Sequence, residues 1–361
     1  MDEFKDNILD GVVYTFHFQG VPAATAHEKL TEMTGGELYT LDRVEDLYRR
    51  IDDKKFGLKK QDFSQLPEHF LQDVIEYSDW RSRATLRKTC KPLRELADAT
   101  RFRIKKFVID GRDGGVEIIL DNHAAIYEVY RRATNDLKTI LMNPKLEIEE
   151  FLLDSIEWNI SHRFERSIFE AFPLSHSLHV ENFSWEGQSP TDEFITLVRT
   201  LNSETLKSIS VQYLHLDSFG ELSETPQWMN AKKFKSIDCD FPEGSFIHLA
   251  HFEKAIVEDA DVSLPFEEVI ELKDRLLLNP KLDQLKIKLF CRNDRQFKRA
   301  FRRLNITDGW ANFDYPDSNL KLSLRVTSVY VWFKGPCYVE DENDQDVRRD
   351  ARMRRLQALE G

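Results

Sequence analysis

Between residues 106 and 335, short β-rich runs alternate with amphipathic helical stretches, and this alternation limits the possible folds more than any other feature. The helical stretches lie near 133–142, 163–172, 191–202 and 266–278. The β-rich runs are Ile148–Leu153, Ser177–Val180, Leu206–Val211, Phe234–Cys239, Phe252–Val257 and Leu285–Leu289. One apolar anchor per run recurs after 27, 31, 25, 22 and 29 residues, taking Phe151, Leu178, Ile209, Phe234, Ile256 and Leu285 as the anchors. Repetition at this length predicts a stack of similar strand-plus-helix units.

Two further patterns belong to this region. The run Asn-Pro-Lys-Leu begins at Asn143 and again at Asn279, each time after a predicted helix and before a predicted strand. Residues 106–110 and 116–120 flank a glycine-rich turn and predict a β-hairpin. We therefore expect an α/β protein whose repeat region is a leucine-rich-repeat-like solenoid, preceded by a helical N-terminal region.

A second region, residues 62–94, predicts two or three short helices. Pro67 suits a first helical turn, where its missing N–H is not needed. Apolar residues then recur at helical spacing until Ser78 and Asp79 break the pattern, which resumes at Leu86. Helices this short cannot bury a core of their own, so the remaining apolar surface needs a partner.

The order of these residues resembles an F-box, the segment that docks substrate receptors onto the adaptor of SCF-type cullin–RING ubiquitin ligases. The family pattern is Leu-Pro, an apolar residue, a Val/Ile-aromatic stretch, a polar break, and then Leu-x-x-x-Cys-Lys-x-Leu-Arg. Ser78 and Thr89 stand where the family usually has Leu and Val. The resemblance implies that the adaptor-binding residues are Leu66, Pro67, Leu71, Val74, Ile75, Tyr77, Leu86, Cys90 and Leu93.

The first sixty residues predict three helices with tight turns, a helix-turn-helix candidate. Gly35 and Gly36 break the chain, and Thr40 is the expected N-cap of the last helix. The motifs Tyr14-x-Phe16, Gly20-x-x-Ala23-x-x-Ala26-His27-x-x-Leu30 and Val44-x-x-x-Tyr48-Arg49-Arg50, with Phe56-x-Leu58, resemble the N-terminal domain of mariner-type transposases. That family places its third helix in the major groove.

The charge of the first sixty residues argues against DNA binding by the third helix. Residues 1–60 contain nine Lys/Arg and twelve Asp/Glu, a net charge of −3, and carboxylates repel a phosphate backbone. A retained fold used for protein contacts, or as a cap on the F-box, is the favoured interpretation. The basic residues that keep a DNA-binding alternative open are Arg43, Arg49, Arg50, Lys54, Lys55, Lys59 and Lys60, with the three arginines as the candidate DNA contacts.

The repeat region resembles the FTH domain that follows the F-box in the nematode F-box A family. The resemblance lies in the hairpin-then-repeat order and in runs such as Glu149–Asp154 and Leu206–Val211. It implies a substrate-recognition domain without catalysis. Polar strand residues expected to face outward are Glu149, Asp154, His179, Glu181, Ser208, Ser210, Gln212, Lys235, Asp238, Asp240, Glu258, Lys286 and Lys288.

Composition narrows the class of protein. The net charge of −12 disfavours general nucleic-acid binding. Four isolated cysteines suggest neither a disulfide framework nor a zinc ribbon. The polar start contains no signal-peptide core, and no apolar run approaches the roughly 20 residues of a membrane helix. We expect a cytoplasmic or nuclear protein without a membrane contact.

Several residues are of types that can serve catalysis or metal binding, but none belongs to a complete site. No phosphate-binding glycine loop, nucleophile elbow or complete metal-ligand set is present. His176/His179 and His248/His251 read as strand pairs whose rings point to opposite faces. Asp238 and Asp240 would share a strand face, but strand alternation makes such pairs routinely. Trp185, Trp228, Trp310 and Trp332 read as core or cap residues.

The sequence thus predicts a helix-turn-helix domain (1–60), an F-box (61–105), an FTH repeat domain (106–335) and a charged tail (336–361). The predicted function is a non-enzymatic substrate receptor that needs no cofactor or metal and binds a Skp-type adaptor and a protein substrate. Two alternatives stay open. One is a DNA- or chromatin-associated protein that uses the N-terminal helices. The other is a repeat scaffold that has lost its adaptor.

Overall fold

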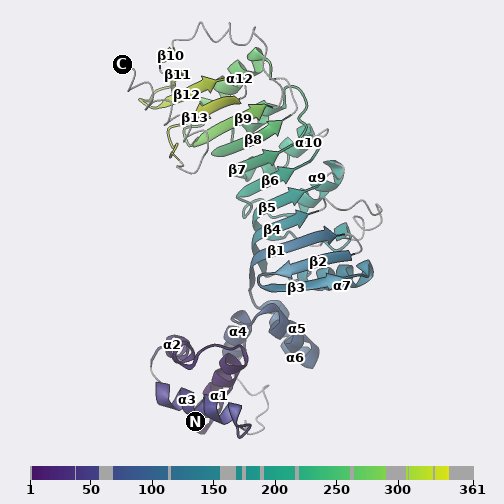
Figure 1. Ribbon diagram of the computed structural model, residues 1–361, viewed down its shortest axis with the longest axis vertical. Helices are drawn as coiled ribbons and strands as arrows, with labels where there is room; N and C mark the ends of the chain where they lie inside the picture. Colours follow the sequence, from purple (N-terminus) through teal and green to yellow (C-terminus); the bar gives the residue numbers. More distant parts are fainter. Residues whose placement is uncertain are drawn as a thin grey trace, which may run out of the picture. The chain divides into compact units, whose positions relative to one another are not determined.

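The structure is a computed structural model of the chain (Figure 1). It describes residues 2–36, 38–56, 68–112, 115–154, 168–172, 176–187, 191–215, 219–260, 264–289, 306–307, 309–327 and 330–340. The chain divides into two compact units, residues 1–74 and 75–361, and each is described by itself. Across the described ranges, no helix combines the length and apolar character that crossing a bilayer requires.

Three helices build the first unit: α1 (Asp2–Phe18), α2 (Ala23–Thr34) and α3 (Leu41–Asp52). Gly35 ends α2 in a left-handed conformation at φ 67°, which glycine adopts without strain. The hydroxyl of Thr40 accepts a hydrogen bond from the Arg43 N–H, so the predicted N-cap of α3 is confirmed. The buried residues that form a small core between these helices are Leu9, Val13, Ala26, Leu30, Tyr39, Val44 and Leu47.

Helix α4 (Glu68–Glu76) spans the boundary between the units, and α5 (Trp80–Thr89) and α6 (Lys91–Ala99) follow in the second unit. The carboxylate of Asp79 caps α5 by accepting the Ser82 N–H at 2.7 Å. Cys90 lies between α5 and α6 in an extended conformation, and Pro92 occupies the first turn of α6. The predicted polar break and the predicted Cys-Lys pair therefore mark the two helix boundaries.

A large sheet forms the rest of the second unit. Its strands are β1 (Phe102–Arg112), β2 (Gly115–Leu120), β3 (His123–Tyr127), β4 (Leu146–Asp154), β5 (His179–Glu186), β6 (Ser208–Gln212), β7 (Lys233–Ile237), β8 (Lys254–Ala260), β9 (Gln284–Leu289), β10 (Ile306–Thr307), β11 (Trp310–Asp314), β12 (Lys321–Val326) and β13 (Tyr330–Lys334). Their order is β10-β11-β12-β13-β9-β8-β7-β6-β5-β4-β1-β2-β3. Strands β1 and β4 to β9 are parallel to one another, and β4 to β9 are neighbours in chain order.

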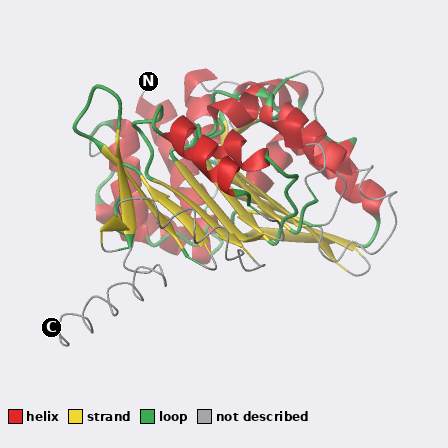
Figure 2. Ribbon diagram, turned by 90° about the horizontal axis from the view of Figure 1, so that it is seen from above, coloured by secondary structure: helices red, strands yellow, loops and turns green. Residues whose placement is uncertain are grey.

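The described helices of this region lie on one face of the sheet, and none of them covers the opposite face, which we call the open face (Figure 2). They are α7 (Tyr130–Leu141), α9 (Thr191–Thr200), α10 (Phe219–Ser223), α11 (Pro226–Asn230), the 3₁₀ helix η2 (Ser245–Leu249) and α12 (Phe266–Leu276). Right-handed crossovers from strand to parallel strand require such a covering layer. The chain is therefore a mixed α/β protein with a helical N-terminal region.

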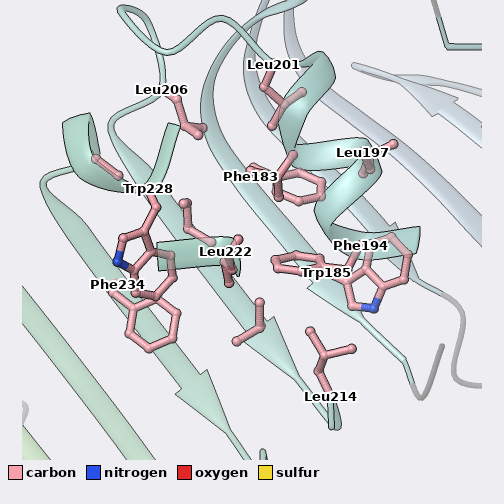
Figure 3. Close-up of a cluster of buried hydrophobic side chains, with 14 of the residues drawn as sticks. Phe183, Trp185, Phe194, Leu197, Leu201, Leu206, Leu214, Leu222, Trp228 and Phe234 are labelled. Carbon is pink, nitrogen blue, oxygen red and sulfur yellow. The ribbon is translucent and has the colours of Figure 1, made fainter. Parts of the chain in front are cut away.

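The core lies between the helices and the sheet, where aromatic rings from successive strands meet. Phe151 of β4 lies between Phe107 and Phe183, with ring centroids 5.2 and 5.4 Å away. Farther along, Trp228 of α11 packs on Phe234 of β7 at 4.9 Å (Figure 3). Full burial of each such side chain contributes about 1.5–3 kcal/mol. The expectation that Trp185 and Trp228 are core residues is confirmed.

Asparagines end three of the connections between helix and strand. The Oδ1 atoms of Asn143, Asn202 and Asn279 each accept a backbone N–H two residues farther along, at 2.8 to 3.2 Å. The Nδ2 of Asn279 also donates to the carbonyls of Ala250 and Phe252, both at 3.0 Å. The two predicted Asn-Pro-Lys-Leu stops are confirmed, whereas Asn202 does the same within a sequence that did not indicate it.

The sheet differs from the expected repeat at its far end. Beyond β9 the neighbours β13, β12, β11 and β10 pair antiparallel, and the sequence did not predict these strands. The link from Val326 to Tyr330 is too short for a crossover helix, so β12 and β13 can only pair antiparallel. The predicted hairpin at the other end is confirmed as β1 and β2. The first half of the predicted helix at 163–172, residues 163–167, lies outside the described residues.

Candidate interaction surfaces

The predicted adaptor-binding residues differ in exposure. Leu71 and Ile75 are buried, whereas Tyr77, just after α4, is 78% exposed, and Cys90 is also exposed. Val74, Leu86 and Leu93 are partly buried. Leu66 and Pro67 lie outside the described residues. The structure therefore leaves part of the predicted set, Tyr77 and Cys90, accessible to a partner.

A buried arginine that the sequence did not single out fixes α5. Arg83 is only 3% exposed, and its guanidinium donates hydrogen bonds to the carbonyls of Ala97, Thr100 and Arg101 at 2.8 to 3.0 Å. Burial lowers the pKa of Arg83 to about 10, so the group stays charged at neutral pH. Three carbonyls at the end of α6 and the start of β1 are thus held by one side chain of α5.

Two ion pairs strengthen this junction. Burial raises the pKa of Asp79, but the Ser82 N–H and His123 on β3, 3.6 Å away, outweigh burial and hold this pKa below its ordinary value. The guanidinium of Arg101 donates to both carboxylate oxygens of Glu147 on β4. Trp80, at the start of α5, packs against the main core. Helices α5 and α6 are consequently held by several contacts to the end of the sheet.

The open face carries rows of side chains that cross the strands in register. One row contains Lys106, Glu150, Asn182, Ser208, Lys233, Lys254, Gln284, Lys334, Ser323 and Asn312. The next contains Val108, Leu152, Ser184, Ser210, Lys235, Ile256, Lys286, Trp332 and Arg325. Several residues predicted to face outward, among them Ser208, Ser210, Lys235 and Lys286, belong to these rows.

A third row on this face begins with three carboxylates, Asp110, Asp154 and Glu186, on β1, β4 and β5. Burial and the Asp154 carboxylate both raise the pKa of Glu186, as expected for like charges on adjacent strands. From β7 onward the first two rows carry lysine and arginine, whereas the third row continues through Gln212 and Ile237 to Glu258 on β8. Carboxylates therefore gather in the third row next to β1, and lysine and arginine gather in the first two rows from β7 to β9 and on to β13.

Aromatic rings accompany the basic residues on and beside β13. Trp332 is fully buried although it lies on the open face, because Trp310, Tyr330 and Tyr338 pack around it. Its indole N–H donates to the Gln284 Oε1 at 2.9 Å. We call the group comprising Lys233, Lys235, Lys254, Lys286, Arg325, Lys334, Trp310, Trp332 and Tyr338 the basic-aromatic patch.

Two of the three arginines proposed for DNA contact, Arg43 and Arg49, have other contacts in the first unit. The Arg43 guanidinium lies 4.0 Å from the centroid of the Tyr39 ring and also donates to its hydroxyl. Arg49 pairs with Asp46 at 3.4 Å, and Arg50 is exposed on α3.

Two expectations about polar pairs were wrong. Strand β7 ends at Ile237, Asp238 has a left-handed φ of 49°, and Asp240 pairs with His215, so the two aspartates do not share a strand face. His248 lies in η2 and the ring of His251 contacts the Trp228 carbonyl at 2.9 Å, so these histidines are not on a strand. His176 likewise precedes β5, which begins at His179. No cluster of metal-ligating side chains occurs in the part of the chain that the structure describes.

Comparison with known proteins gives one informative result. No curated protein matches the chain. Among solved structures, the crystal structure of an ADP complex of Bacillus subtilis pyridoxal kinase aligns with a TM-score of 0.23 and 9% identity, over 68% of this chain and 78% of that chain. A likeness at this TM-score carries no argument about fold or chemistry. The family model described as the FTH domain matches residues 162–305, and this stretch of the chain is therefore similar to an FTH domain.

Proposed function

We propose that the chain is a substrate-receptor subunit of an SCF-type cullin–RING ubiquitin ligase and catalyses no reaction itself. The FTH match at residues 162–305 supports this proposal most strongly, because FTH domains are associated with F-box proteins. Helices α4 to α6 follow the order of an F-box and precede the matched stretch. In this proposal the helices bind a Skp-type adaptor, and the sheet holds a protein substrate.

The mechanism is proximity. A receptor raises the effective concentration of its substrate near the transferring subunit, and the geometry of the connection decides how well it does so. The hydrogen bonds of Arg83 and the Arg101–Glu147 pair support a stiff connection between α5–α6 and the sheet. We infer further that β1 and β4 to β9 act as a leucine-rich-repeat-like solenoid, because solenoids present rows of strand side chains as recognition surfaces.

The test is co-expression with the cognate Skp-type adaptor, followed by size-exclusion chromatography. We expect a stable one-to-one complex that Leu66→Ala/Pro67→Ala abolishes and Tyr77→Ala weakens. Tyr77 is 78% exposed, so its truncation should leave folding intact. The matched control is Ile126→Ala on β3, which removes a side chain that is 71% exposed at a site outside the predicted set.

The outcomes separate the alternatives. If the wild-type chain and all variants elute without the adaptor, the receptor proposal fails and a repeat scaffold becomes the better explanation. If the chain instead binds duplex DNA in a salt-sensitive manner that Arg50→Ala weakens, the DNA-associated alternative is favoured.

A further inference from the structure

The basic-aromatic patch combines features that a solvated strand face does not require. Lys233 and Lys254 are directly opposite each other on β7 and β8. Like charges at opposed strand positions destabilise a sheet. Lys254 also contacts Asp283 at 3.5 Å, but among the described residues neither Lys233 nor Lys235 has an ion-pair partner. Violations of local charge rules are expected where a surface has a function.

Aromatic contacts hold two positive charges of the patch, those of Lys334 and Lys286, in place. The Lys334 Nζ lies 4.1 Å from the Tyr338 ring centroid, 4.3 Å from that of Trp332 and 4.8 Å from that of Trp310. The Lys286 Nζ lies 4.6 Å from the Trp332 centroid. An ammonium held against rings has lost most of its rotamer freedom before a ligand arrives, so a bound anion costs less ordering entropy.

We propose that the basic-aromatic patch binds an acidic peptide segment of the protein substrate. This proposal rests on the proposed function, because that function supplies the protein substrate. Charge complementarity is the first argument: Lys233, Lys235 and Lys254 form a compact group of cations on two neighbouring strands, although the whole chain carries a net charge of −12. An acidic segment lying across the neighbouring strands β7, β8, β9 and β13 would pass over Lys235, Lys254, the largely buried Lys286 and Lys334 in turn.

The carboxylates of the third row on the same face favour a short peptide over a nucleic acid. Strands lie about 4.8 Å apart, so β5 with Glu186 is only about 10 Å from β7 with Lys235. A long polyanion that crosses the face would meet Glu186 and Asp154 soon after leaving the lysines. A peptide with a few consecutive carboxylates can stay over the basic strands, and its basic or polar flank can extend toward β5.

The test measures fluorescence anisotropy of a short fluorescein-labelled poly-glutamate peptide mixed with the full chain. We expect binding that weakens as salt increases. Lys233→Glu/Lys235→Glu should weaken it at least tenfold, or about 1.4 kcal/mol. Lys334→Met keeps the packing against the rings but removes the charge, and should weaken binding a few-fold. The control Lys138→Glu/Lys281→Glu makes the same charge change at two exposed positions outside the patch and should leave affinity within twofold.

Three results would overturn the proposal. Equal loss in both double variants would show a general charge effect. Labelled duplex DNA that binds as tightly as poly-glutamate, with the same sensitivity to Lys233→Glu/Lys235→Glu, would make the patch a nucleic-acid site. Binding by a chain that ends at Glu340, but not by the full chain, would mean that the chain's own acidic residues 341–346 occupy the patch.

The co-expression experiment with the adaptor gives a result that does not depend on the peptide-binding measurements. Complex formation with the adaptor but no peptide binding would disprove only the proposal that the patch binds an acidic peptide. Peptide binding without adaptor association would disprove the receptor role and leave the patch as an interaction site of a scaffold. Melting temperatures of all variants should match the wild type, which shows that lost binding is not lost folding.

Discussion

The guanidinium of Arg83 lies over the ring of Phe102, with 4.6 Å between Cζ and the ring centroid. The same guanidinium donates to the carbonyls of Ala97, Thr100 and Arg101, which are the last turn of α6 and the residues that lead into β1. One side chain of α5 thus connects the helical segment to the first strand of the sheet. Its geometry determines the direction in which α5 and α6 leave the sheet.

Replacing Arg83 should therefore destabilise this junction. Arg83→Met keeps much of the buried aliphatic volume but leaves three carbonyls without their donor. Each unsatisfied buried polar group costs about 1–3 kcal/mol, and partial rescue by water should bring the total to about 2–4 kcal/mol. Urea denaturation measures the loss in the free energy of unfolding.

The control lies on the same helix. Arg81 is exposed, so Arg81→Met should change the free energy of unfolding by less than about 0.5 kcal/mol. Hydrogen exchange should show faster exchange in α6 and the first residues of β1 for Arg83→Met alone. Equal stability of the two variants would show that the three hydrogen bonds contribute little.

Features that depend on local chemistry could be predicted from the sequence. The anchors Phe151, Ile209 and Phe234 are core residues because strand alternation points them to the helical face. Thr40 caps α3 because its side chain reaches an N–H three residues away. Asn143 and Asn279 end helices through a hydrogen bond two residues along. Short sequence separation makes each of these visible in one stretch of chain.

The features that the sequence did not indicate depend on strand register and on contacts between residues far apart in the sequence. The three carbonyls that Arg83 meets are 14 to 18 residues away, and its position in the sequence suggests a solvated helix face. Trp332 and Gln284 are 48 residues apart. The neighbouring lysines at Lys233 and Lys254 meet only because β7 and β8 pair in one register. The basic-aromatic patch therefore could not be read from the sequence.

Gly335 occupies a position where no side chain fits. A Cβ atom at this residue would overlap the backbone carbonyl of Leu282, and the Gly335 N–H donates to the Asp283 carbonyl at 2.8 Å. Gly335→Ala should force the end of β13 away from the segment before β9 and cost about 1–3 kcal/mol. Gly220→Ala in α10, where nothing lies within 4 Å of the added atom, should be neutral or slightly stabilising. Thermal unfolding of the two variants tests the contrast.

The carboxylate of Glu268 should make stability depend on pH. Burial is the main cause that raises its pKa, with help from Glu243 and Glu271, although Oε1 accepts the Phe246 N–H at 3.0 Å. A folded-state pKa above the ordinary value of 4.5 means that this residue costs nothing at lower pH and destabilises the fold progressively as pH rises above that value.

Glu268→Gln should accordingly be as stable as the wild type near pH 4 and more stable at pH 7 to 8. Denaturation across this pH range measures the difference. The neighbouring Glu267 is exposed. The difference in the free energy of unfolding between Glu267→Gln and the wild type should therefore not grow as the pH rises from 4 to 8. Parallel profiles of stability against pH for the wild type and Glu268→Gln would disprove the raised pKa of Glu268.

The two Asn-Pro-Lys-Leu motifs differ in one respect that a matched substitution can detect. Both asparagines accept a backbone N–H through Oδ1, but among the described residues only the Nδ2 of Asn279 donates to carbonyls of the preceding connection, those of Ala250 and Phe252. Aspartate keeps the Oδ1 acceptor and replaces the donor with a second acceptor. Asn279→Asp should therefore cost about 2–3 kcal/mol, since two carbonyls lose their donor and face a carboxylate oxygen. Asn143→Asp should stay within about 0.5 kcal/mol. Equal losses at the two positions would mean that the turn, and not the bridge from Asn279, determines the stability of these connections.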